Sequence, residues 1–254
     1  MTRFAIEAMA TRFEVVLSDA SQALGDLILD EIADWHHRLN RFAADSWVAH
    51  VNRTAASSPV RCDEDTWGLV IDAQDVWRAS GGAFDITRGF GHALILNADT
   101  RTLTFAHSSM RLDFGGIAKG HALDCCGRLL RDHGVTSAFL HGGTSSGLAI
   151  GLDPSGRPWT VHLGTRLRQG YGGQAPELRL VDAAFSVSDP SSQPHPHIVD
   201  PRSGEMIARV GAAPVTVTGP SARVCEAWST AAVVLGGAVQ VPQGYSVTIT
   251  RNDS

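Results

Sequence analysis

The sequence predicts an α+β fold in which helices pack on sheets that are mostly antiparallel. Segments with strand-like apolar patterns occur near the N-terminus and through the second half of the 254 residues, and segments with helical periodicity separate them. The two types do not alternate in the regular strand–helix–strand order that a parallel, doubly wound sheet requires. With 43% hydrophobic and 19% charged residues, the chain has the composition of a globular protein with a full core.

Four segments place apolar residues three or four positions apart, as on one face of a helix. In the first segment, this apolar face extends from Leu24 to Leu39. Glycines serve as stop signals after the other three segments, at Gly81-Gly82, Gly134 and Gly236-Gly237. The predicted helices span residues 21–40, 64–80, about 117–133 and about 221–235.

The predicted strands are short apolar runs bounded by turn-forming residues. The first two, residues 4–9 and 12–18, alternate apolar and polar residues and are expected to pair across a turn. The glycine-containing segment 164–177 is predicted to be a surface loop. The other predicted strands span residues 137–143, 147–152, 159–163, 178–182, 183–188, 213–219 and 245–250.

Charge and cysteine content argue against several classes of protein. A net charge of −5 and a pI of about 6.1 do not suit a nucleic-acid-binding surface, which needs a basic stripe. No apolar run approaches the roughly 20 residues that span a bilayer, and the N-terminus has no signal-peptide pattern. The four cysteines form no CxxC pair, which favours reduced thiols over a zinc site. We therefore expect a cytoplasmic protein without a direct membrane segment.

Lys119 is the only lysine among the 21 basic residues, and it follows Gly115-Gly116 at the start of a predicted helix. Paired glycines allow the backbone to approach a ligand closely, and the first turn of a helix carries unpaired N–H groups and partial positive charge. A cation there opposes the helix dipole, which is tolerable where an anion such as a phosphate binds. The alternative is a lysine that extends into solvent from an ordinary helix start. The segment matches neither the P-loop nor the GxGxxG pattern.

The last predicted helix places Glu226 and Thr230 four residues apart, hence on one face, with Ser229 beside them. The flanking residues are apolar, so the carboxylate and the hydroxyls need partners. A hard cation such as Mg²⁺ suits oxygen ligands, whereas the alternative is a surface glutamate and a threonine that bonds to its own helix. Two further residues are ambiguous alone: His197 precedes an Asp-Pro turn, and Asp85 follows a glycine pair in a strand-like context.

Eight motifs span nearly the whole chain in collinear order. They are MATRF (9–13), DSWVAHVN (45–52), SGGAFDIT (80–87), LDFGGIAKGHALD (112–124), HGGTSSGLAIG (141–151), AFSVS (184–188), HIVDPRSG (197–204) and CEAWSTAAVVLG (225–236). Together they resemble the ApbE family, the FAD:protein FMN transferases. The resemblance implies one domain over residues 1–254, with mixed, mostly antiparallel sheets and packed helices, related to the tunnelling fold. It also implies FAD in a cleft, Mg²⁺ at its diphosphate, and transfer of FMN to a Ser or Thr hydroxyl of a partner protein with release of AMP.

The resemblance further implies roles for individual residues. His197 matches the catalytic candidate, which would accept the proton of the acceptor hydroxyl or orient that hydroxyl. The metal would be held by the Gly116 carbonyl, Glu226 and Thr230, with Ser229 as a helper. The residues expected to contact FAD are Met9, Phe42, Ala83, Phe84, Asp85, Asp113, Lys119 and Val199.

Three departures from the family pattern bear on activity. Glu226 stands where the family usually has Asp, the segment 186–189 reads Ser-Val-Ser-Asp in place of Ser-Thr-Ser-Gly, and 142–144 reads Gly-Gly-Thr in place of Gly-Gly-Asp. Two alternatives therefore stay open: an FAD pyrophosphatase that yields FMN and AMP, and a non-catalytic FAD-binding protein. The expected partner is an acceptor protein that carries a Ser/Thr flavinylation site. No nucleic-acid partner is expected, and a homodimer is one alternative for the oligomeric state.

Overall fold

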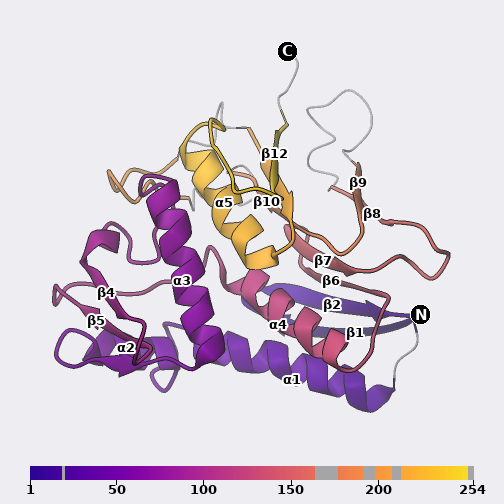
Figure 1. Ribbon diagram of the computed structural model, residues 1–254, viewed down its shortest axis with the longest axis horizontal. Helices are drawn as coiled ribbons and strands as arrows, with labels where there is room; N and C mark the ends of the chain where they lie inside the picture. Colours follow the sequence, from indigo (N-terminus) through magenta and orange to yellow (C-terminus); the bar gives the residue numbers. More distant parts are fainter. Residues whose placement is uncertain (19–20, 164–176, 191–197, 208–212, 251–254) are drawn as a thin grey trace.

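A seven-stranded antiparallel sheet extends through the structure, and helices pack on one of its faces (Figure 1). The computed structural model describes residues 1–18, 21–163, 177–190, 198–207 and 213–250. The N-terminal hairpin forms one edge of the sheet, and the last strand forms the other edge. In spatial order the strands are β1 (Thr2–Ala8), β2 (Thr11–Leu17), β6 (Ala138–Gly142), β7 (Ser146–Ile150), β10 (Ala184–Ser188), β11 (Val215–Gly219) and β12 (Ser246–Ile249).

Three helices contact the sheet directly, and their apolar faces form the core with it. α1 (Gln22–Arg38) contacts β1 and α4, whereas α4 (Ala118–Asp132) contacts β6 and β7. α5 (Ala222–Val234) contacts β10 and β11, and α3 (Glu64–Ala79) lies against α5. The two helices that carry the candidate ligands, α4 and α5, therefore pack side by side on the same sheet (Figure 1).

Shorter elements lie between α1 and α4 in the sequence and form a layer beside the main sheet (Figure 1). They include a second antiparallel sheet, in the order β3-β5-β4. A third sheet is the two-stranded pair β8-β9. The bounds are α2 (Trp47–Thr54), β3 (Val60–Arg61), η1 (Gly91–Ala93), β4 (Leu94–Asn97), β5 (Thr102–Phe105), β8 (Trp159–His162) and β9 (Glu177–Leu180).

The helix starts differ in one respect that matters for the site. In α1, α2, α3 and α5 the residue before the helix is Ser or Asp, whose side chain accepts a hydrogen bond from a backbone N–H of the first turn. α4 has Ile117 at this position, which has no side-chain acceptor. The backbone N–H groups at the start of α4 therefore depend on partners from elsewhere in the structure.

Most predicted elements are confirmed, and the misses have identifiable causes. The four predicted helices and all nine predicted strands occur within a few residues of their expected bounds. α2 and the second sheet are not predicted, because their segments are too short to show a clear period. Asp85, expected in a strand-like context, lies in a loop, and so does Asp113. Apart from its last residue, the predicted loop 164–177 lies outside the described residues.

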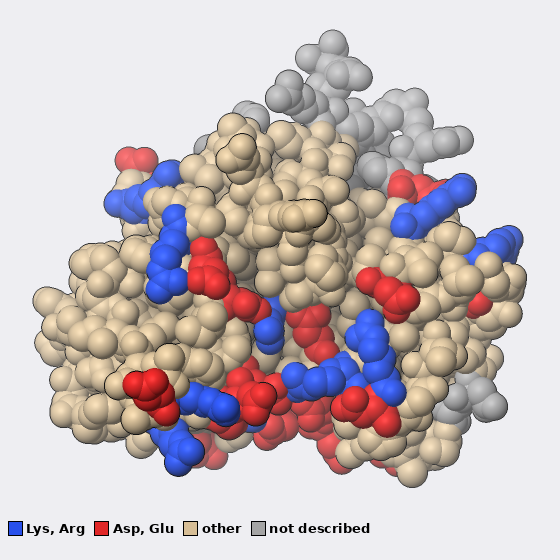
Figure 2. All heavy atoms as spheres, viewed as in Figure 1, with Lys and Arg blue, Asp and Glu red and all other residues tan. Residues whose placement is uncertain are grey.

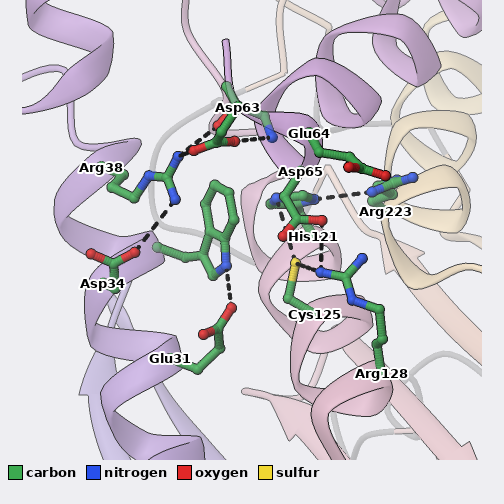
Figure 3. Close-up of polar contacts among 12 residues, drawn as sticks. Glu31, Asp34, Arg38, Asp63, Glu64, Asp65, His121, Cys125, Arg128 and Arg223 are labelled. Carbon is green, nitrogen blue, oxygen red and sulfur yellow. Dashed lines mark hydrogen bonds and ion pairs between the residues drawn. The ribbon is translucent and has the colours of Figure 1, made fainter. Parts of the chain in front are cut away.

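A buried polar network joins α1, α3, α4 and α5 behind the start of α4 (Figure 3). Its centre is the fully buried His121, whose ring meets Trp35 edge-on at 4.1 Å between ring centroids. Nδ1 of His121 lies 3.3 Å from a guanidinium nitrogen of Arg223, and Nε2 lies 3.7 Å from Sγ of Cys125. Burial, reinforced by nearby arginines, holds the pKa of His121 well below its ordinary value.

The surface charge and the state of the cysteines can be compared with the expectations from composition. On the face shown in Figure 2, basic and acidic side chains are interspersed, so this face carries no basic stripe. All four cysteines, Cys62, Cys125, Cys126 and Cys225, are buried and unpaired, as predicted. None of the helices within the described ranges is long and apolar enough to cross a bilayer.

Candidate active site

A cleft of about 900 Å³ opens where α4 begins, beside α5 and the end of β10. The loop at 83–88 and the segment at 198–206 form further parts of its wall. Segments from distant parts of the sequence thus meet at one cavity. The cleft is lined by ten of the thirteen residues predicted for the site: Phe42, Ala83, Phe84, Asp85, Asp113, Gly116, Lys119, Val199, Glu226 and Thr230.

The carboxylate of Glu226 occupies the position where the sequence predicted an anion. One of its oxygens pairs with the ammonium of Lys119, and the other accepts a hydrogen bond from the backbone N–H of Gly120 at 2.7 Å. Glu226 is 4% exposed, so its charge needs both partners. The start of α4 and its lysine therefore form an anion-binding geometry, and in this structure a side chain of the same chain supplies the anion.

Gly116 brings the chain backbone against α5. A Cβ atom at this position would lie 3.7 Å from Oγ1 of Thr230 and only 3.2 Å from the ring of Phe84. The φ angle of Gly116 is not positive, so glycine serves close approach here and not an unusual backbone angle. Gly116, Thr230 and Glu226 therefore line one end of the cleft together, as the predicted metal site requires.

Hydroxyl groups from β10 and α5 form a connected array beside this end of the cleft. Ser188 Oγ lies 2.9 Å from Ser229 Oγ and 3.4 Å from Thr230 Oγ1. Ser229 is fully buried and donates to Ser186 Oγ at 3.1 Å. Both α5 hydroxyls also hydrogen-bond to the Glu226 carbonyl, at 3.0 and 3.2 Å. Ser229 thus lies behind the lining residues, whereas Ser188, which sequence reasoning did not assign, lines the cleft.

Asp85 lines the cleft but organises its own loop. Its carboxylate accepts hydrogen bonds from the backbone N–H and hydroxyl of Thr87 at 2.7 and 2.6 Å. It also accepts from the N–H groups of Gly89 and Gly91 at 2.9 and 3.0 Å. With four donors from its own loop, this carboxylate fixes the position of Ala83 and Phe84 in the cleft wall.

Asp113 connects the glycine turn to two arginines. Its Oδ1 accepts from the Gly115 N–H at 3.0 Å, and its Oδ2 lies 3.2 Å from Arg41 and 3.9 Å from Arg88. Asn52 of α2 holds the preceding residue from both sides, because its amide donates to the Leu112 carbonyl and accepts from the Leu112 N–H. The DSWVAHVN motif therefore supports the glycine turn through its last residue, a role that the sequence pattern did not indicate.

Besides Ser229, two predicted residues are not part of the described cleft. Met9 lies at the turn between β1 and β2, where its backbone N–H donates to His36 Nδ1 at 3.1 Å, and it is not among the described residues that line the cleft. His197 lies outside the described residues. Roles for both remain predictions.

Asp124 and Gly120 fix α5 against α4, and sequence reasoning assigned neither. The carboxylate of Asp124 accepts from the Ser221 hydroxyl and from the N–H groups of Ala222 and Arg223, at 2.6, 2.8 and 3.1 Å. A Cβ at Gly120 would overlap the carbonyl of Ala222, so only glycine allows this helix crossing. Burial raises the pKa of the Asp124 carboxyl, although these hydrogen bonds oppose the shift.

Comparisons with known proteins identify the family. The sequence model of the ApbE family matches residues 9–91 and 90–242, which together cover most of the chain. The chain belongs to the ApbE family. A relative from Treponema pallidum (strain Nichols), named FAD:protein FMN transferase, is 27% identical over an alignment of 238 residues, and the match covers 76% of this chain. The match covers 66% of that relative, so the chain spans just under two thirds of its length.

Solved structures of ApbE proteins share the fold. The ApbE protein of Thermotoga maritima superposes with a TM-score of 0.82 at 20% identity, covering 98% of this chain and 93% of the other. The flavin transferase ApbE of Vibrio cholerae gives 0.81 at 18% identity, covering 98% and 96%. The flavinyl transferase ApbE of Pseudomonas stutzeri gives 0.79 at 22% identity, covering 98% and 94%. The predicted α+β, ApbE-like fold is confirmed.

Proposed function

We propose that this ApbE protein transfers FMN from FAD to a Ser or Thr hydroxyl of a partner protein and releases AMP. The observation that carries the proposal is the convergence of Lys119, Glu226 and Thr230 at the glycine turn before α4, within one cleft. The relative from Treponema pallidum is named for this activity. The cleft is also large enough, at about 900 Å³, to hold a dinucleotide.

The charges in the cleft support a divalent cation as part of the reaction. Three basic residues and four acidic ones line the cleft within the described ranges, so the doubly negative diphosphate of FAD needs further positive charge. Among these residues, no three His, Cys, Asp or Glu side chains gather as a metal site. Glu226, Thr230 and the Gly116 carbonyl nevertheless fit Mg²⁺, which typically takes one or two carboxylates and completes its shell with substrate phosphates. When bound, Mg²⁺ would neutralise charge on the leaving phosphate.

The chain's own residues position the reactants. Lys119 and the N–H groups at the start of α4 would hold the phosphate that becomes AMP, where negative charge increases as the bond breaks. The acceptor oxygen forms a bond to the FMN phosphorus while the bond from that phosphorus to the AMP oxygen breaks. The hydroxyl proton leaves to a base, for which His197 is the candidate. Little covalent chemistry falls to the enzyme, so alignment and electrostatics account for most of the rate.

The decisive experiment combines the protein with FAD, Mg²⁺ and a candidate acceptor protein. We expect mass spectrometry to show an added FMN on a Ser or Thr of the acceptor, and chromatography to show AMP in equal amount. Chelation by EDTA and the variant Glu226→Gln should both abolish transfer. AMP that accumulates together with free FMN and with no FMN on the acceptor, or full activity in EDTA, would contradict the proposal.

A second candidate function, FAD pyrophosphatase activity, follows from the part of the cleft wall at the end of β10. Asp189 lines the cleft where the family pattern has glycine, and its carboxylate would activate a water molecule as the attacking group. In that case water would replace the protein hydroxyl, and the products would be FMN and AMP. Incubation with FAD and Mg²⁺ alone separates the two functions, because only the pyrophosphatase releases FMN without an acceptor.

A further inference from the structure

A second groove of about 1180 Å³ continues from the cleft. The two cavities share four lining residues, Arg41, Phe42, Arg88 and Asp113, so a molecule in the groove can extend into the cleft. The groove is formed by α2, the chain before it, and the loops around Arg88 and Arg111. None of the residues predicted for the metal site lines it.

The groove is basic, although the whole chain carries a net charge of −5. Four arginines and one aspartate line it within the described residues, which is a formal excess of three positive charges. Asp113 is near Arg41 and Arg88, whereas Arg53 and Arg111 line the groove but not the cleft. Their guanidinium groups donate to backbone carbonyls, Arg53 to Ala44 at 2.8 Å and Arg111 to Ser108 and Met110 at 2.9 and 2.6 Å. These neutral acceptors hold the two side chains in place without neutralising their charge.

An aromatic residue stands at the boundary between the groove and the cleft. Phe42 is 83% exposed, and the guanidinium of Arg41 lies 4.6 Å from its ring centroid. An exposed phenylalanine between two cavities offers apolar contact to a bound chain. Ser57 and Ser108 also line the groove; the Ser57 hydroxyl donates to the Thr54 carbonyl at 2.9 Å, so its oxygen offers an acceptor to a peptide N–H.

We propose that this basic groove docks an acidic segment of the acceptor protein and directs its hydroxyl into the cleft. The inference rests on the proposed transfer function and names the surface and the partner chemistry that this function needs. Carboxylates on the acceptor would meet Arg53 and Arg111, which lie outside the cleft where the FAD diphosphate has its own cation, Lys119. Complementary charge of this kind increases the association rate and excludes partners of the wrong sign.

The test uses a short fluorescein-labelled peptide in which aspartates flank a central threonine, and the same peptide with asparagine in place of each aspartate. Fluorescence anisotropy measures binding at low salt to the wild type and to the double variant Arg53→Gln, Arg111→Gln. The matched control is Arg157→Gln, Arg179→Gln, which removes two exposed arginines from a different cavity. We expect the groove variant to bind the acidic peptide about tenfold more weakly and the control to bind it like the wild type.

A second variant keeps every arginine contact in place. Ser108→Glu adds a carboxylate to the groove and should weaken binding of the acidic peptide but not of the asparagine peptide. Flavin fluorescence measures FAD affinity for each protein, and we expect it to stay within about twofold of the wild type in all variants. If the wild type does not bind FAD, the proposed function fails, whereas the peptide result tests the groove alone. Equal binding of both peptides, no binding to the wild type, unchanged binding to the groove variants, or a loss of FAD affinity in them would overturn the docking proposal.

Discussion

The structure explains how Lys119 is tolerated in the first turn of a helix, which its local sequence does not explain. A lysine in the first turn of α4 opposes the helix dipole, and local sequence offers no compensating charge. The structure supplies one from 107 positions away, because the Glu226 carboxylate binds both the lysine and the Gly120 N–H. The extra methylene of Glu226, compared with the aspartate of the family pattern, gives the carboxylate additional reach. A substrate phosphate must therefore share its cations with Glu226 or replace it.

Removal of the lysine charge should weaken FAD binding. We expect Lys119→Met to lower FAD affinity about tenfold or more, because a charge-assisted hydrogen bond contributes roughly 1.5–3 kcal/mol. Quenching of flavin fluorescence on titration gives the affinity directly, and Arg131→Met on the same helix is the matched control. Lys119→Arg should recover part of the loss. An affinity for Lys119→Met equal to that of the wild type would refute the assignment.

For individual residues, the sequence predicted which ones come together in the cleft but not the contacts that they make there. Ten of the thirteen predicted residues line one cleft, since the motifs that contain them are local and recognisable. The Lys119–Glu226 pair, the Asn52 clamp on Leu112 and the donors around Asp85 depend on side-chain geometry and on contacts between distant segments. No periodicity or composition encodes such contacts.

Among the elements, α4 and α5 form a unit that sets the spacing of the site. Gly120 allows the helices to touch, and Asp124 of α4 caps the start of α5. Because Glu226 and Thr230 lie on α5 and Lys119 on α4, this capping contact fixes the distance between them. The sequence predicts both helices from their apolar periodicity. Nothing in the local sequence of α4, however, indicates that its Asp124 caps the start of α5.

Loss of the Asp124 carboxylate should destabilise the protein. We expect Asp124→Ala to lower the free energy of unfolding by about 2–4 kcal/mol, since a buried cap and its hydrogen bonds are lost together. Urea denaturation monitored by circular dichroism measures the change. Asp132→Ala, at the exposed end of the same helix, is the control and should stay within about 0.5 kcal/mol of the wild type. A similar result for Asp124→Ala would mean that the cap does not hold α5.

The network around His121 should make stability depend on pH. Burial depresses the pKa of His121 in the folded state, so below its ordinary value of 6.5 the unfolded chain binds a proton that the folded protein excludes. Stability contributed by the neutral ring is therefore complete above this value and declines as pH falls below it. Between about pH 7.5 and about pH 5.5 the loss from this group is about 1.4 kcal/mol.

The variant His121→Phe keeps a ring against Trp35 and removes the titrating group. We expect its free energy of unfolding to fall by about 1.4 kcal/mol less than that of the wild type over the same pH range. His133→Phe, at the exposed residue that follows the last residue of the same helix, is the control for the replacement of a histidine by phenylalanine. A pH dependence in His121→Phe as steep as in the wild type would show that another group is responsible.

In the molecule as a whole, the site depends on several parts of the fold that lie far apart in the sequence. The cleft takes residues from the layer before α4, from the end of β10 and from both central helices. The sequence predicted the α+β class and most elements, but it could not predict the strand order β1-β2-β6-β7-β10-β11-β12. Neighbours such as β2 and β6 are separated by more than a hundred residues, and their pairing is decided by packing.

A ligand that bridges these parts should stabilise all of them together. At about one hundred times the dissociation constant, FAD with Mg²⁺ should add about 2.7 kcal/mol, which raises the Tm by about 5–10 °C for a chain of this size. Differential scanning fluorimetry at increasing FAD concentration measures the shift. We expect EDTA, and separately Glu226→Gln, to reduce it. A full shift under both conditions would contradict a metal at Glu226.

The burial of every cysteine makes this chain a suitable background for chemical labelling. Thiol reagents attack the thiolate, and burial raises the pKa of the Cys62 and Cys125 thiols to about 12, while Cys126 and Cys225 are shifted in the same direction. A maleimide dye would therefore react with a newly introduced surface thiol, for example in Ser57→Cys, and leave the native ones unmodified. A dye at that position would report on an arriving protein in real time.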